Sequence, residues 1–125
     1  MAEPEYLTDA FTREGVSFIN RHAAEPFFLH LAYNAPQDSP FTAPQSYLDR
    51  VVNIIDPARQ RYAAMVTALD DGVGQVLQVL QANNLLDNTL IFFLSDHGGE
   101  HSSAVRRVPL QGGKGGLLEG GIRLP

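Results

Sequence analysis

Two short apolar runs separated by one long amphipathic stretch place the strongest constraint on how this chain can fold. The first run, residues 26–33, reads PFFLHLAY, and the second, residues 89–94, reads TLIFFL. Short, nearly continuous apolar runs are typical of strands buried on both faces. Between the two runs, apolar side chains recur every three or four residues from about 57 to 83, which predicts a long amphipathic helix. The residues of this stripe are Tyr62, Met65, Val66, Leu69, Val73, Val76, Leu77 and Leu80.

The ends of this helix have their own signals. Pro57 suits a first helical turn, and Asn83 with Asn84 can end the helix. Gly72 and Gly74 lie inside it and predict either a close contact or a kink there.

Shorter helices are predicted on the N-terminal side of the long one. One runs from Asp9 to about His22, with Thr8 as its N-cap, and another covers residues 45–50.

A strand, a long helix and a second strand make a crossover unit, so the two strands should be parallel and the connection right-handed. Parallel strands end at the same edge of a sheet, and in open α/β folds that edge carries the ligand. Residues 34–37 leave the first strand there, and residues 95–100 leave the second. The pattern therefore predicts an α/β fold in which two polar loops converge on one site.

Composition excludes several classes of function. The chain has nine basic and fourteen acidic residues, a formal net charge of −5 and a single lysine, so no basic stripe exists for nucleic acid. Cysteine is absent, which rules out disulfides and thiolate metal sites. No apolar run approaches the roughly 18 residues of a membrane helix. The first residues do not resemble a signal peptide, and the compartment stays open.

The sharpest local signal is the sequence Ser95-Asp96-His97-Gly98-Gly99-Glu100, directly after the second apolar run. Asp96 offers a hard oxygen ligand and His97 a nitrogen ligand, so the pair suits a divalent cation. The alternative is that Asp96 caps a turn and His97 is an ordinary loop residue. Two ligands do not close a metal site, so both interpretations stand on these residues alone.

The second signal is the glycine-rich block at residues 112–123, which holds the only lysine, Lys114. Flanking glycines allow backbone N–H groups and one ammonium to close around an anion. The block is not a phosphate-binding P-loop, because the spacing differs and no Ser or Thr follows the lysine. The alternative is a flexible loop with a solvated lysine.

Four blocks occur in an order and spacing that resemble the type I, formylglycine-dependent sulfatases of the alkaline-phosphatase superfamily. They are PFFLHLAYNAP (26–36), RYAAMVTALDDGVGQVLQVL (61–80), NTLIFFLSDHGGE (88–100) and PLQGGKGGLLEGGIRLP (109–125). The resemblance implies an alkaline-phosphatase-like sandwich with a mostly parallel sheet and flanking helices. It also implies that residues 1–125 are the middle segment of a larger catalytic domain, without its N-terminal nucleophile region and its C-terminal region.

In this family a formylglycine hydrate attacks sulfur while a divalent cation, usually Ca²⁺, holds the sulfate oxygens. The resemblance implies that Asp96 and His97 are two of the metal ligands and that Lys114 contacts the sulfate group. Glu119 and Arg123 match the family block as well, and we interpret them as ion pairs that shape the loop. The remaining acidic ligands and the formylglycine are expected upstream of Tyr6.

The loop after the first apolar run departs from the family pattern, because Gln37 stands where the family usually has histidine. The amide of Gln37 can orient a sulfate but cannot act as a general acid. His30 is not an obvious replacement, since it lies within the predicted strand, where a core or interface histidine is expected. The segment Ser102–Arg106 fits the short nucleophile pattern by letter, and we interpret that match as chance.

The sequence thus predicts part of a sulfuric ester hydrolase that acts on a small-molecule or polysaccharide sulfate ester, with no activity in the isolated chain. Two alternatives stay open: a phosphatase or phosphonate hydrolase of the same superfamily, and an inactive remnant that binds metal or sulfate.

Overall fold

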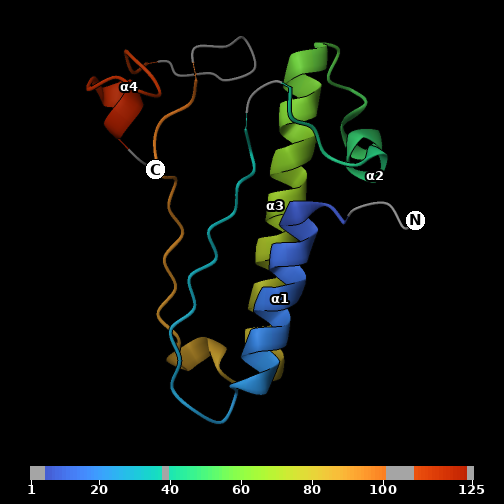
Figure 1. Ribbon diagram of the computed structural model, residues 1–125, viewed down its shortest axis with the longest axis vertical. Coiled ribbons are helices and arrows are strands. Elements are labelled where there is room, and N and C mark those ends of the chain that lie inside the picture. Colours follow the sequence, from blue (N-terminus) through green and yellow to red (C-terminus); the bar gives the residue numbers. More distant parts are fainter. Residues whose placement is uncertain (1–4, 38–39, 101–108, 124–125) are drawn as a thin grey trace.

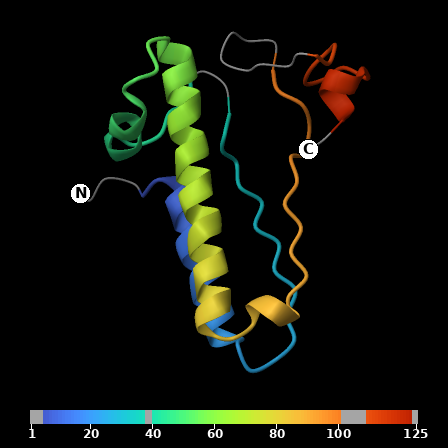
Figure 2. The same ribbon diagram turned by 180° about the vertical axis from the view of Figure 1, so that it is seen from behind.

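The computed structural model describes residues 5–37, 40–100 and 109–123. In chain order, its helical elements are α1 (Leu7–Arg21), α2 (Gln45–Leu48), η1 (Asp49–Val51), α3 (Pro57–Ala82), η2 (Leu86–Asn88) and α4 (Glu119–Ile122), where η marks 3₁₀ helices. Helices α1 and α3 pack side by side along the long axis of the molecule, and two extended segments run alongside them (Figures 1 and 2).

The long helix α3 has the ends that the sequence predicts. Pro57 is its first residue, and the side chain of the N-cap residue Asp56 accepts a hydrogen bond from the Arg59 backbone N–H at 2.7 Å. Asn83 is the C-cap, and Asn84 has a φ of 57°, in the left-handed region that asparagine tolerates. Within the described part of the chain, neither this helix nor any other has the length and apolar character needed to cross a bilayer.

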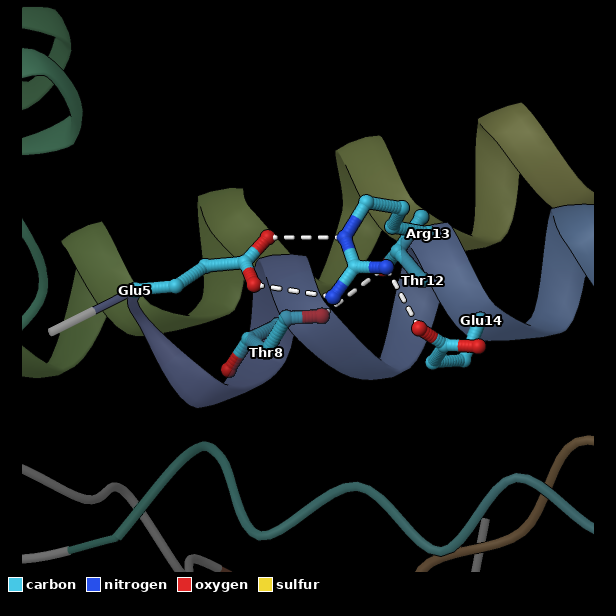
Figure 3. A network of polar contacts seen from close by, with 5 residues as sticks. All are labelled: Glu5, Thr8, Thr12, Arg13 and Glu14. Carbon is cyan, nitrogen blue, oxygen red and sulfur yellow. Dashed lines mark hydrogen bonds and ion pairs between the residues drawn. The ribbon is translucent and has the colours of Figure 1, made fainter.

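Helix α1 begins two residues earlier than predicted, and Thr8 is not its cap. The helix starts at Leu7, and the Tyr6 carbonyl accepts the Ala10 N–H at 3.0 Å. Thr8 is the second residue of the helix, and it is fully buried. Figure 3 shows the outer side of this first turn, where Arg13 pairs with Glu5 at 3.0 Å.

The seam between α1 and α3 is tight where Thr12 meets Gly72. The buried residues of α1 are Thr8, Thr12, Gly15 and Ile19. Opposite them, Gly72 of α3 makes a close contact and not a kink: an added Cβ would lie 2.4 Å from Thr12 Oγ1 and 3.1 Å from the Tyr33 hydroxyl. Gly74 has nothing within 4 Å of such an atom.

Two apolar clusters lie toward opposite ends of this helix pair. One contains Ala35, Ala43, Ala64 and Met65, with Tyr6, Tyr47, Leu48 and Val51 packed against it. The other contains Ile19, Val79 and Leu80, with Val16, Phe27, Leu29, Val76, Leu85 and Leu86 packed against it. The predicted stripe of α3 is therefore only partly correct. Val66 and Leu77 are 41% and 37% exposed, while Ala64 and Ala68 are buried in their place.

The two predicted strands are extended segments that run in the same direction (Figures 1 and 2). Neither is assigned as a strand, and the described residues contain no strand elsewhere. Burial on both faces is also wrong for this chain. In the first segment half-buried and exposed residues alternate from Phe27 to Asn34, and Phe28 is 89% exposed. In the second, Leu90–Leu94 is exposed throughout.

Candidate functional site

Two polar turns meet where the second extended segment ends. The turn at residues 95–100 follows that segment, and the glycine-rich block at residues 112–123, which contains α4, lies beside it (Figure 1). Gly98 N–H donates to the Gly121 carbonyl at 2.9 Å, and Lys114 N–H donates to the Gly99 carbonyl at 3.0 Å. These backbone hydrogen bonds bring the two sequence-predicted motifs together.

Close backbone packing holds the glycine-rich block in place. A Cβ on Gly98 would lie 1.8 Å from the Gly120 carbonyl oxygen, and one on Gly121 would lie 2.4 Å from the Gly116 carbonyl oxygen. No side chain fits at either distance, so glycine is required at both positions. A freely flexible loop, the alternative interpretation of this block, does not describe residues packed this tightly.

Asp96 and His97 lie next to each other on the surface of the first turn. His97 Nε2 is 3.2 Å from Asp96 Oδ2, and the two side chains are 39% and 83% exposed. The Ser95 hydroxyl donates to the His97 carbonyl at 2.7 Å and so ties the turn to itself. Both side chains are therefore accessible to a ligand from solvent.

The hydrogen bond on the other ring nitrogen of His97 fixes what Nε2 can do. His97 Nδ1 lies 2.9 Å from the Gly98 carbonyl, which only accepts, so Nδ1 carries a proton. In neutral imidazole Nε2 then presents a lone pair beside the Asp96 carboxylate. Two acceptors this close need a proton or a cation between or near them. This donor chemistry fits a divalent cation, and the Gly98 carbonyl plays the orienting role seen around metal-bound histidines.

The donor set in the described residues is partial. They contain no group of three or more His, Cys, Asp or Glu side chains that could hold a metal ion. A closed site needs more oxygen ligands than Asp96 and His97 supply. The pair can form one side of a cation site, and further ligands must come from elsewhere.

Lys114 points to the first turn as well. Its Nζ donates to Glu100 Oε1 at 2.7 Å, and the two side chains are 36% and 38% exposed. Glu100 was not singled out as a site residue by the sequence. The only signal was its position at the end of the Asp96-His97 motif. Within the block, Arg123 lies 3.6 Å from Glu119, which agrees with the predicted ion pair.

The other predicted site positions lie apart from this junction or outside the described residues. Gln37 follows the first extended segment and is partly buried. His30 is exposed on the open face of that segment and is not a core histidine. Ser102–Arg106 lies outside the described residues.

Known proteins resemble the chain over nearly all its length. The family model Sulfatase matches residues 2–125. Arylsulfatase J of Mus musculus is 36% identical over 119 residues, and N-acetylgalactosamine-6-sulfatase of Homo sapiens is 36% identical over 128 residues. The matches cover 94% and 95% of this chain but 20% and 22% of those proteins, so the chain spans about a fifth of their length.

Solved structures agree with the sequence relatives. A crystal structure of Ps i-CgsB in complex with k-i-k-neocarrahexaose superimposes with a TM-score of 0.91 at 45% identity. The match covers all of this chain and 28% of that one. With a family model that matches almost every residue, the conclusion is direct: this chain belongs to the sulfatase family.

Proposed function

We propose that the chain is the middle segment of a sulfatase catalytic domain and contributes part of the site that hydrolyses sulfate esters. One observation carries this proposal: the backbone junction that places the Lys114 block against the Asp96-His97 turn. The finer fold assignment, a mostly parallel sheet with flanking helices, is supported by the common direction of the two extended segments. The TM-score of 0.91 with a solved relative supports it too.

Asp96 and His97 would hold a divalent cation, and the oxygen-rich ligands that the family supplies favour Ca²⁺. When bound, such a cation offers Lewis-acid stabilisation of charge on sulfate oxygens. Asp96 contributes a carboxylate oxygen, and His97 contributes Nε2 while its Nδ1–H stays on the Gly98 carbonyl. Further ligands and the formylglycine nucleophile would lie upstream of Tyr6.

Lys114 would contact the sulfate group directly. Its ammonium has three N–H donors and uses one on Glu100, so two remain for sulfate oxygens. A fixed positive charge at the oxygens on which negative charge builds up stabilises the transition state more than the ground state. Lys114 therefore acts on the rate of sulfate transfer.

Gln37 would orient the substrate without transferring a proton. Its side-chain N–H can donate to a sulfate or leaving-group oxygen, but an amide does not titrate near neutral pH. The leaving group must then take its proton from another residue or from water. Esters with acidic leaving groups, such as aryl sulfates, should depend on this proton least.

The substrate class we propose is a sulfate ester carried by an oligosaccharide. A relative that is 45% identical over the whole chain was crystallised with k-i-k-neocarrahexaose, and another relative is an N-acetylgalactosamine-6-sulfatase. Both names point to carbohydrate ligands for those proteins. We extend that class to this chain.

The test uses the natural gene product that contains this chain. Intact mass and peptide mapping should find a longer protein with an upstream Cys or Ser converted to formylglycine. That protein should hydrolyse an aryl sulfate, and Lys114→Ala should lower kcat/KM by about 10²-fold, the usual effect of losing one oxyanion donor. Arg123→Gln, in the same block, is the matched control and should stay within about threefold of wild type.

Three results would contradict the proposal. Faster turnover of a phosphate monoester than of the matched sulfate ester would assign a phosphatase. Binding of Ca²⁺ and a sulfated oligosaccharide without turnover would assign a binding module. Sulfate release by the pure 125-residue chain would show that the catalytic groups are not where we place them.

A further inference from the structure

Among the described residues, Glu100 is the charged side chain that contacts the Lys114 ammonium. The Nζ–Oε1 distance of 2.7 Å is that of a charge-assisted hydrogen bond. Both side chains are little more than a third exposed, so solvent screens this pair less than it screens the other ion pairs between described residues. The Arg123–Glu119 pair in the same block is longer, at 3.6 Å, and its side chains are 66% and 63% exposed.

The ion pair adds to a backbone that is already fixed. Lys114 N–H bonds to the Gly99 carbonyl, and Gly98 N–H bonds to the Gly121 carbonyl. The Lys114 Cα is therefore held beside the turn, and only its four-carbon side chain is free to move. An unrestrained lysine side chain loses rotamer entropy when it binds an anion. A carboxylate that fixes the ammonium beforehand removes part of that loss from the reaction.

We propose that Glu100 is a positioning residue that holds the Lys114 ammonium against the Asp96-His97 turn with two donors left for the sulfate. This inference rests on the proposed function, because it assumes that Lys114 contacts sulfate. Glu100 also weakens binding of the substrate in the ground state, because its negative charge repels the sulfate. Losing Glu100 thus costs orientation but relieves repulsion.

The balance of those two effects gives a kinetic signature. Glu100→Ala should lower kcat about tenfold, the range of a hydrogen bond to a charged group, while KM changes less than about threefold. Glu100→Gln keeps the shape and one acceptor oxygen, so its kcat should lie between alanine and wild type. Glu119→Ala, which removes the acidic side chain of the glycine-rich block, is the control and should leave both constants near wild type.

A second readout follows the position of Lys114 itself. It is the only lysine, so lysine labelled with ¹³C gives a single side-chain spin system in the 125-residue chain. Relaxation of the Cε signal should report a restrained side chain in wild type and in Glu119→Ala. It should report a mobile one in Glu100→Ala, with Glu100→Gln in between.

The outcomes separate this inference from the proposed function. Unchanged Lys114 mobility and unchanged kcat in Glu100→Ala would overturn the positioning role, while low activity of Lys114→Ala would leave the proposed function intact. Full activity of Lys114→Ala would overturn both. If Glu100→Ala loses its helical circular dichroism, Glu100→Gln decides the matter, and a wild-type Lys114 signal and kcat in that variant would overturn the inference.

Discussion

The two extended segments are similarly apolar, yet they have very different surroundings. In the first, the ring of Phe27 packs edge-on against that of Phe18, with 5.7 Å between the ring centroids. The Tyr33 hydroxyl lies 3.0 Å from Thr12 Oγ1. Alternate side chains of this segment therefore pack on α1. In the second, every residue from Leu90 to Leu94 is between 47% and 81% exposed. An apolar run identifies a segment whose side chains favour burial, but the elements that bury them lie elsewhere in the sequence.

The largest expected effect compares one isoleucine from each region. Ile19 is 1% exposed in the cluster that covers the start of the first segment, and Ile91 is 47% exposed. Ile19→Ala should lower the free energy of unfolding by about 2–5 kcal/mol, because it leaves a cavity. Ile91→Ala should change it by less than about 0.5 kcal/mol. Urea titrations followed by circular dichroism at 222 nm would measure both. Equal losses would show that the second segment is covered in this chain.

Two neighbouring glycines of α3 should show smaller changes in the free energy of unfolding, with opposite signs. Gly72→Ala should destabilise the chain by about 1–3 kcal/mol, because its Cβ would clash with the buried, hydrogen-bonded hydroxyl of Thr12. Gly74→Ala should stabilise it by about 0.5–1 kcal/mol through helix propensity. Thermal melts of the two variants would test the pair. Stabilisation by both would mean that α1 and α3 pack less closely than we describe.

The smallest effect concerns the cluster in which the first segment ends. Partial burial, with a hydrogen bond to Asp9 at 2.8 Å, raises the pKa of Tyr47 to about 12. A folded pKa above the unfolded value of about 10 favours the native state below pH 10. That contribution is lost as the pH rises from 10 toward 12. The free energy of unfolding should therefore fall over this range in wild type and fall less in Tyr47→Phe. Identical dependence of the free energy of unfolding on pH in the two proteins would show that Tyr47 does not contribute.

Local signals in the sequence predicted the helices better than the contacts between them. Pro57 and the Asn83-Asn84 pair gave both ends of α3, because caps depend on adjacent residues. Thr8 was assigned wrongly as a cap, because it lies inside the helix and is fully buried, and burial cannot be read from adjacent residues. Gly72 could only be flagged as a close contact or a kink, since the hydroxyl that it meets belongs to Thr12.

The candidate site shows the same division. Asp96 with His97, and Lys114 within its glycines, were identifiable as two motifs from residue type and spacing. Their junction depends on hydrogen bonds between positions more than ten residues apart, such as Gly98 to Gly121, and spacing alone does not give those. Glu100 was missed for the same reason, since its partner is Lys114.

The central claim is that the Asp96-His97 pair and Lys114 form one site, and paramagnetic broadening tests it most directly. Lysine-labelled 125-residue chain would be titrated with Mn²⁺ up to about 1 mM, a range suited to an incomplete oxygen-rich site. We predict that Mn²⁺ broadens the Lys114 Cε signal beyond detection and that excess Ca²⁺ restores it. The signal should not broaden in Asp96→Asn or His97→Ala. A Lys114 signal that stays sharp, or one that broadens equally in both variants, would contradict the account.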